Sequence, residues 1–181
     1  MRALVEASRA GKLHAEVALV LSNRAEAEGL HFAWDNSIPA LILNPSRYPT
    51  REDYVADLLH YLEHYQVDLI ALAGYLKKLP DELIELYAGR ILNIHPSLLP
   101  KHGGKGMYGL KVHQAVLDTG ESETGVTVHL VTNEYDEGPA FAQESVPVIA
   151  GDTPEVLAAR VLEVEHRLYP EALERFIRGS A

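Results

Sequence analysis

Two polar side chains stand close together in residues 90–100, RILNIHPSLLP, an otherwise apolar segment. In a strand over residues 90–95, Asn93 and His95 share one face while Ile94 enters the opposite layer, because side chains alternate along a strand. An imidazole can transfer protons near neutral pH, and an amide N–H can stabilise an oxyanion. Buried polar groups must be paired or used, since leaving them unpaired is costly. The pattern therefore fits a catalytic pair and a hydrogen-bond network that closes the strand equally well.

A second polar group follows in residues 127–136, TVHLVTNEYD. His129 lies in an expected strand, and Asp136 follows in a loop that also contains Gly138. Taken alone, Asp136 and Gly138 favour a simple turn. A histidine within a strand is equally well explained by ordinary hydrogen bonding, so this segment gains a chemical interpretation only in combination with the first one.

The elements that must position these residues alternate along the chain. Expected helices cover residues 2–10, 25–34, 50–66, 80–87 and 110–117 and a long segment from 154 onward; expected strands cover residues 16–21, 40–43, 67–73, 90–95, 125–131 and 139–148. Such alternation predicts an open, mostly parallel α/β sheet with helices on both faces and right-handed crossovers. Ligands bind such sheets beyond the carboxyl ends of the strands, which is where the two polar groups fall.

Several details sharpen these elements. Thr50 and Thr153 stand where side chains cap helices. The last strand is expected at an edge, because Gln-Glu-Ser interrupts its apolar run. Pro170 is expected to divide the last helix into two parts. The segment KHGGKGMYGLK, residues 101–111, lacks nucleotide-loop spacing and indicates a mobile loop at the active site.

Composition limits the classes of function. The 181 residues fit one domain, and the net charge of −10 disfavours nucleic acid as the main partner. The absence of cysteine excludes disulfides, thiolate nucleophiles and Cys-ligated metals. His102 and His113 have no metal-like spacing, so no metal is expected. No apolar run approaches a membrane span and no secretory signal opens the chain, so we expect a cytoplasmic protein with no membrane partner.

Three motifs give a specific resemblance: NIHPSLLP, then GVTVHLVTNEYDEGP, then RVLEVEHRLYP. In this order and spacing they resemble the folate-dependent glycinamide ribonucleotide formyltransferases of de novo purine synthesis, over essentially the whole chain. NIHPS alone resembles the wider group of folate-dependent formyl-transfer enzymes. The resemblance implies a Rossmann-like formyltransferase fold, with residues 1–181 as a single formyltransferase domain.

The resemblance also implies a reaction and its residues. The formyl group of 10-formyltetrahydrofolate would pass to the amine of glycinamide ribonucleotide, with Asn93, His95 and Asp136 as catalytic residues. Asn93 would donate to the oxyanion and His95 would transfer a proton. Asp136 would raise the pKa of His95 and keep it protonated. His129 would support the same pocket by organising Asp136 and water.

Binding residues follow from the same resemblance. Those implied for folate are Arg51, Leu76, Lys77, Lys78, Leu79, Asn93, Thr132, Asn133, Glu134, Tyr135 and Asp136. Glu165, in EVEHRLYP, would hold the glycinamide end of the substrate. From the residues alone, core packing explains Leu76 and Leu79 as well, and a solvated helical position explains Arg51 and Glu165 as well.

The chain departs from this family at its start. The family opens with a strand and a Gly-x-Gly-Ser-Asn loop that holds the substrate phosphate, whereas Met1 aligns with the start of the following helix. We therefore expect the fold without its first strand, and weak binding of the substrate phosphate. The flanking strands, residues 16–21 and 67–73, are expected either to be bridged by backbone from elsewhere or to close up and pair with each other.

Three alternatives stay open. A formyltetrahydrofolate deformylase would use a similar Asn, His and Asp set with water as acceptor. A tRNA formyltransferase is disfavoured by the short length and acidic charge. A non-catalytic folate-binding remnant would follow from loss of the phosphate loop. The expected partners are the two small-molecule substrates, and a homodimer is compatible with the sequence.

Overall fold

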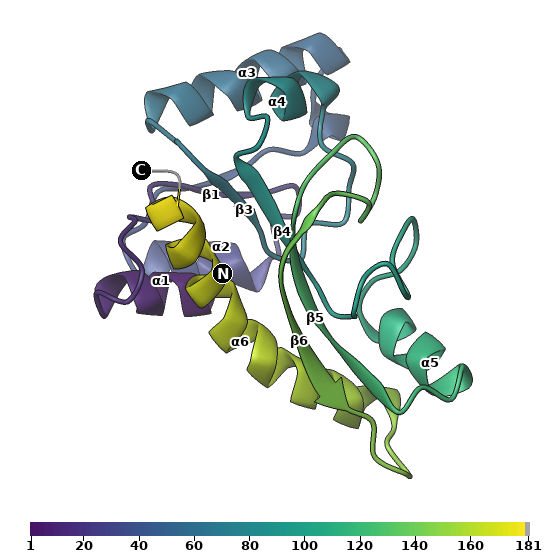
Figure 1. The fold of residues 1–181 in the computed structure, drawn as a ribbon. Helices are drawn as coiled ribbons and strands as arrows, with labels where there is room; N and C mark the ends of the chain where they lie inside the picture. The colour runs from purple at the N-terminus through teal and green to yellow at the C-terminus, as the bar shows by residue number, and fades with distance from the viewer. Residues whose placement is uncertain (180–181) are drawn as a thin grey trace.

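The computed structural model describes residues 1–179 (Figure 1). The helices are α1 (Arg2–Arg9), α2 (Glu28–Asp35), η1 (Pro45–Arg47, a 3₁₀ turn), α3 (Arg51–His64), α4 (Asp81–Leu86), α5 (Leu110–Asp118) and α6 (Pro154–Gly179). The strands are β1 (Val20–Ser22), β2 (Ala40–Ile42), β3 (Ile70–Leu72), β4 (Ile91–His95), β5 (Glu123–Leu130) and β6 (Ala140–Pro147). The predicted order of helices and strands is confirmed.

The strands form two groups in the described part of the chain. β1 and β2 pair in parallel, and a second sheet has the order β3-β4-β5-β6. Within it β3 and β4 are parallel, whereas β5 is antiparallel to both of its neighbours. The α/β class predicted from the sequence is confirmed, and so is the edge position of β6.

β1 and β3 do not pair with each other. Among residues 1–179, β1 pairs only with β2, and β3 pairs only with β4. Of the two expected outcomes, the less favoured one, in which these strands close up and pair directly, is therefore excluded, and bridging by backbone from outside the described residues stays a prediction. Direct pairing would require the helices over both strands to repack. Each ladder spans three residues, which is shorter than the apolar runs 16–21 and 67–73 from which the strands were predicted.

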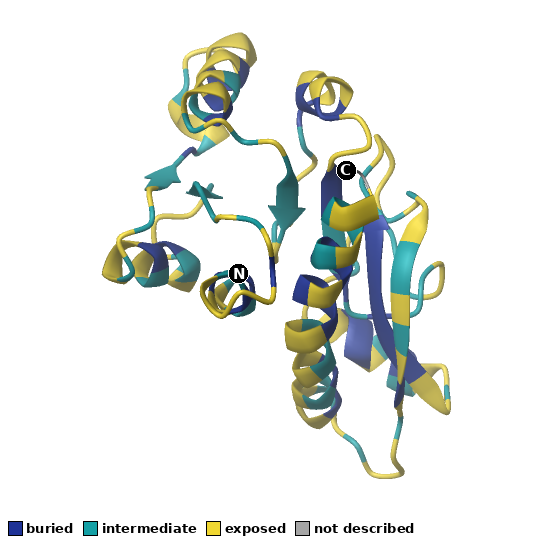
Figure 2. Cartoon of the chain, turned by 60° about the vertical axis from the view of Figure 1, so that its left-hand side comes forward, coloured by how far each residue is buried: buried dark blue, intermediate teal, exposed yellow. Residues whose placement is uncertain are grey.

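Two hydrophobic cores lie on opposite faces of the larger sheet. Leu92 of β4 packs into one core, which contains residues of α1, α5 and α6. Ile91 packs into the other, which contains residues of α3 and α4. Figure 2 shows the buried strands β4 and β5 beside α6. The alternation along β4 thus assigns Leu92 and Ile94 to one layer and leaves Asn93 and His95 for the other.

The predicted helix caps are confirmed. The Thr50 hydroxyl accepts a hydrogen bond from the backbone N–H of Asp53 at 3.1 Å, at the start of α3. The Thr153 hydroxyl accepts one from the N–H of Val156 at 3.3 Å, at the start of α6. These bonds satisfy N–H groups that lack a partner within the helix, so each helix begins where the sequence predicted.

The prediction that Pro170 divides the last helix is wrong. α6 runs without a break from Pro154 to Gly179, with Pro170 inside it. A proline within a helix costs about 3 kcal/mol. Pro170, Tyr169 and Leu173 are all buried, and the Tyr169 hydroxyl hydrogen-bonds the backbone carbonyls of Leu72 and Leu92 at 2.9 and 3.0 Å. The hydrogen bonds to β3 and β4 hold the helix just before the proline, and the burial of Leu173 holds it just after.

Candidate active site

The polar cluster is built where the carboxyl end of β4 lies beside β5. Asn93 is the register partner of His129, and His95 that of Thr127. The Asn93 side-chain nitrogen lies 3.1 Å from Nε2 of His129. His95 and His129 are buried, with 4% and 2% of their surface exposed. The structure therefore brings together Asn93, His95 and His129 from neighbouring strands, as the strand pattern predicted for the first two.

The hydrogen bonds of His129 orient the Asn93 amide. Nδ1 of His129 lies 2.9 Å from the carbonyl oxygen of Leu130, which can only accept, so Nδ1 carries the proton. In the neutral ring Nε2 then accepts a hydrogen bond from the Asn93 amide. One N–H of Asn93 is used in this bond, and the second N–H is available to a ligand oxygen.

His95 lies between a carbonyl and a carboxylate. Its Nε2 donates to the backbone carbonyl of His102 at 2.9 Å, so Nε2 carries the proton. Its Nδ1 lies 3.5 Å from Oδ2 of Asp136. Nδ1 is thus the nitrogen that takes up and releases a proton, with Asp136 beside it to stabilise the imidazolium.

Burial outweighs the carboxylate in setting the pKa of His95. Burial in the protein lowers this pKa, while Asp136 and the carbonyl of His102 act to raise it, and the net direction is downward. The expectation that Asp136 keeps His95 protonated is therefore wrong. Burial removes the hydration of the charged ring, and this lowers the pKa of His95 more than Asp136 raises it. A neutral His95 is suited to accept a proton from an attacking amine.

Asp136 remains a carboxylate in this setting. Burial acts to raise its pKa, but His129 and His95, when their rings are protonated, and the backbone N–H of Gly104 together hold the pKa below its ordinary value. Gly104 donates to Oδ2 at 2.8 Å, and Oδ1 lies 3.6 Å from Nε2 of His129. Asp136 has a φ of +57°, a left-handed conformation that Asp tolerates better than most residues.

A hollow adjoins this cluster. It is lined by Leu72, Tyr75, Lys77, Lys78, Leu79, Ile84, Asn93, His129, Val131, Thr132, Asn133, Glu134, Tyr135 and Asp136. Nine of the eleven residues expected around folate are among them, and the two that are not are Arg51 and Leu76. The segments at residues 75–79 and 131–136 therefore meet beside the catalytic candidates, and Leu72, Leu79 and Ile84 give the hollow an apolar part.

Arg51 and Leu76 do not line this hollow. The Arg51 guanidinium forms two hydrogen bonds with the Glu82 carboxylate, at 2.6 and 2.7 Å, on the exposed surface. Leu76 is 50% exposed, which excludes the core-packing interpretation of that residue.

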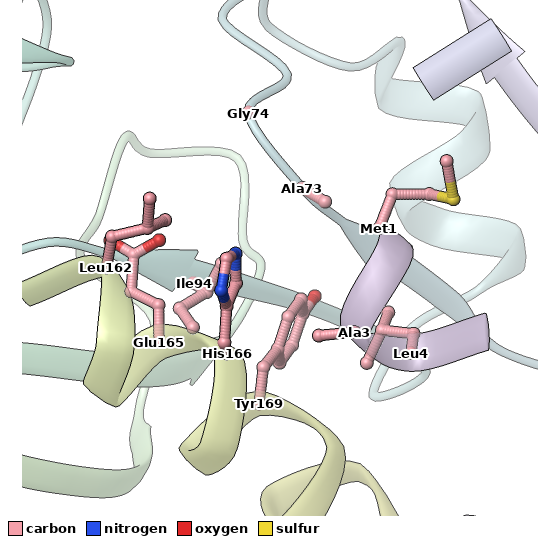
Figure 3. Close-up of a pocket in the computed structure, with 10 residues that line it drawn as sticks. All are labelled: Met1, Ala3, Leu4, Ala73, Gly74, Ile94, Leu162, Glu165, His166 and Tyr169. Atoms are coloured by element: carbon pink, nitrogen blue, oxygen red, sulfur yellow. The ribbon is translucent and has the colours of Figure 1, made fainter. Parts of the chain in front are cut away.

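Glu165 lies in a second hollow on the other side of β4. Figure 3 shows Glu165 and His166 projecting from α6, with Ile94 behind them and Met1 and Ala73 opposite. Burial raises the pKa of Glu165 to about 7, although the amino group of Met1 acts in the opposite direction. A carboxylate with such a pKa gains from a cationic or hydroxyl-bearing ligand that restores the hydrogen bonds it lost on burial.

Sequence reasoning missed the backbone groups of the loop at residues 101–109. The His102 carbonyl and the Gly104 N–H bind His95 and Asp136, yet no side-chain pattern marks them. Tyr75, which also lines the first hollow, lies three residues past the end of β3, so its position beyond a strand end was the available signal.

Within residues 1–179 there is no cluster of three or more side chains suited to hold a metal ion. None of the helices in that range is both long and apolar enough to span a bilayer.

Fold and site together define an α/β protein with an amide, an imidazole and a carboxylate at the end of a central strand. A family model described as formyl transferase matches residues 1–173. The chain belongs to the formyl transferase family. Within this family it is similar to phosphoribosylglycinamide formyltransferases, which confirms the resemblance seen in the sequence motifs.

The relatives show how far the similarity extends. The chain is 46% identical over 173 residues to the chloroplastic phosphoribosylglycinamide formyltransferase of Vigna unguiculata, covering 96% of this chain and 55% of that protein. It is 40% identical to the Escherichia coli enzyme of the same name, covering 99% of this chain and 82% of that one. The chain thus spans about half the length of the plant relative.

Solved structures agree with these relatives. The phosphoribosylglycinamide formyltransferase of Bacillus halodurans superposes with a TM-score of 0.90 at 36% identity, covering 99% of this chain and 90% of that one. A formyltetrahydrofolate deformylase from Pseudomonas syringae is more distant, with a TM-score of 0.83 at 27% identity, covering 98% of this chain and 57% of that one.

Proposed function

We propose that this protein transfers the formyl group of 10-formyltetrahydrofolate to the primary amine of glycinamide ribonucleotide. The observation that carries the proposal is a linked polar cluster at one edge of a hollow lined by nine residues expected to bind folate. In this cluster Asp136 lies 3.5 Å from His95 and 3.6 Å from His129, and His129 lies 3.1 Å from Asn93. The second hollow, with Glu165, lies on the opposite side of β4. Donor and acceptor would approach the end of this strand from two sides.

The chemistry follows from the orientation of the groups. The amine attacks the formyl carbon, a C–N bond forms, and the carbonyl oxygen becomes an oxyanion. The free N–H of Asn93 donates to that oxygen, a contribution of roughly 3 kcal/mol for one such donor. On attack the amine nitrogen becomes an ammonium, and Nδ1 of His95 accepts a proton from it. The bond between the carbon and N10 of the folate then breaks, and the proton passes to N10.

Asp136 and His129 act around this exchange. The Asp136 carboxylate stabilises the imidazolium that His95 becomes during transfer. His129 accepts from Asn93 and so directs its second N–H toward the ligand. Both roles need the buried position of the two histidines, because water would otherwise screen the charges and compete for the hydrogen bonds.

A deformylase is the second candidate, because water could replace the amine in the same site. The two reactions are separated by following both products from labelled 10-formyltetrahydrofolate. Transfer of the label to glycinamide ribonucleotide, giving the formylated product, supports the transferase. Formate released at the same rate with and without glycinamide ribonucleotide would replace it with the deformylase.

A further inference from the structure

The loop that covers His95 touches both catalytic candidates through its backbone. The carbonyl of His102 accepts from Nε2 of His95 at 2.9 Å, and the N–H of Gly104 donates to Asp136 at 2.8 Å. Gly103 lies between them in close packing: an added Cβ would lie 2.4 Å from Leu99 Cδ2, so Leu99 would have to move, and 3.3 Å from Asp136 Cβ. The position of residues 102–104 therefore decides how His95 and Asp136 are held.

The other side of this loop is held by Glu121, which lies between α5 and β5. The Glu121 carboxylate accepts two hydrogen bonds from Nζ of Lys101, at 2.9 and 3.1 Å. It also lies 3.7 Å from Nε2 of His102. That nitrogen is buried and has no hydrogen-bond partner among the described residues. The Glu121 and His102 side chains are 24% and 13% exposed, so water and salt screen this charge contact less than an exposed one.

We propose that Glu121 is a positioning residue of the active site, which holds Lys101 and His102 and thereby keeps the His102 carbonyl on His95 and the Gly104 N–H on Asp136. The inference rests on the proposed function for its kinetic consequence. The structural consequence of the inference, the hydrogen bond between His95 and the His102 carbonyl, does not depend on the proposed function. Ser97, whose hydroxyl donates to the Lys101 carbonyl at 2.6 Å, anchors only the start of the loop.

His102 acts on the pKa of His95 in two opposite ways, through its ring and through its backbone carbonyl. The sign of the pKa change in a variant shows which of the two dominates. Asp136 acts to raise the pKa of His95, and the rings of His129 and His102 act to lower it. His113 of α5 also faces His95, whose charge helps to lower the pKa of His113. Removing the His102 ring would raise the pKa of His95 through space. Losing the His102 carbonyl as an acceptor would lower it.

The test is a histidine NMR titration of wild type, Glu121→Gln and His102→Asn, with formyl-transfer kinetics on the same samples. Asn tolerates the φ of +54° at position 102 but is too short to reach Glu121. Glu123→Gln is the matched control, because it removes the same charge two residues along, from an exposed position. Circular dichroism checks that all variants fold.

We expect Glu121→Gln and His102→Asn to lower the pKa of His95 and to lower kcat roughly 10- to 100-fold, the usual effect of a small misplacement. The KM for folate should stay the same, and Glu123→Gln should behave like the wild type. A raised pKa of His95 in His102→Asn, or identical behaviour of Glu121→Gln and Glu123→Gln, would overturn the inference. A wild type that transfers no formyl group would instead refute the proposed function, and the titration would still decide the role of Glu121.

Discussion

Glu165→Gln should stabilise the protein at alkaline pH but not at acidic pH. Burial raises the pKa of Glu165 from its ordinary value of 4.5 to about 7. Between these two values the folded protein holds a proton that the unfolded chain has lost. Stability therefore falls as the pH rises through this window, and above it the full cost of a buried carboxylate is present. A glutamine has no charge to bury, so the variant escapes this cost.

The magnitude follows from the width of the window. Each unit of difference between the pKa in the folded protein and in the unfolded chain is worth about 1.4 kcal/mol. The difference between 4.5 and about 7 therefore corresponds to about 3 kcal/mol. The Glu165 side chain is only partly buried in its hollow, so we expect a measured gain of about 2 kcal/mol at about pH 8. At about pH 4 the wild type and the variant should unfold with nearly the same free energy.

Urea denaturation of both proteins at the two pH values measures this difference. Glu163→Gln is the matched control, because Glu163 is exposed and lies on the same helix. It should change the free energy of unfolding by less than about 0.5 kcal/mol. A Glu165→Gln effect that is the same at acidic and alkaline pH would refute the reasoning, since it would mean that burial does not penalise this carboxylate.

Three further predictions concern the site and the sheet. Asn93→Ala should lower kcat by roughly 100-fold or more, because an oxyanion donor is lost; steady-state kinetics and calorimetry check this, and a loss confined to folate affinity would contradict the oxyanion role. Asp136→Asn should lower the pKa of His95 and move the acidic limb of the pH–rate profile to lower pH, because a carboxylate that raises this pKa is removed; an unchanged or raised pKa in NMR titration would exclude the pairing. Tyr169→Phe should cost about 1–2 kcal/mol in urea denaturation, because two backbone carbonyls of β3 and β4 lose a buried donor, and a neutral result would mean that water replaces it.

Much of the fold could be predicted from the sequence, because local rules decided it. The alternation around Asn93 and Ile94 assigned their faces correctly, since the period of a strand leaves no other choice. Thr50 and Thr153 marked helix starts because their hydroxyls satisfy nearby N–H groups. Pro170 misled the prediction, because its local cost is outweighed by burial and by contacts with distant strands.

The candidate site was predictable only in part, for a different physical reason. His95 and Asp136 were placed through the resemblance, and their 3.5 Å separation agrees with that placement. The direction of the pKa of His95 depends on the balance between burial and one carboxylate, which no sequence pattern reports. The loop carbonyl on His95 and the contact of Glu121 with His102 depend on backbone positions across distant segments, so they emerged only from the structure.

The most direct test of the central claim is formyl transfer by the wild-type protein and by His95→Ala, measured with 10-formyltetrahydrofolate and glycinamide ribonucleotide. We predict that the wild type forms the formylated product and that His95→Ala loses nearly all of this activity. Binding of a folate analogue should persist in the variant, because His95 is not among the residues that line the folate hollow. Normal turnover by His95→Ala would contradict the assignment of the catalytic proton transfer to this histidine.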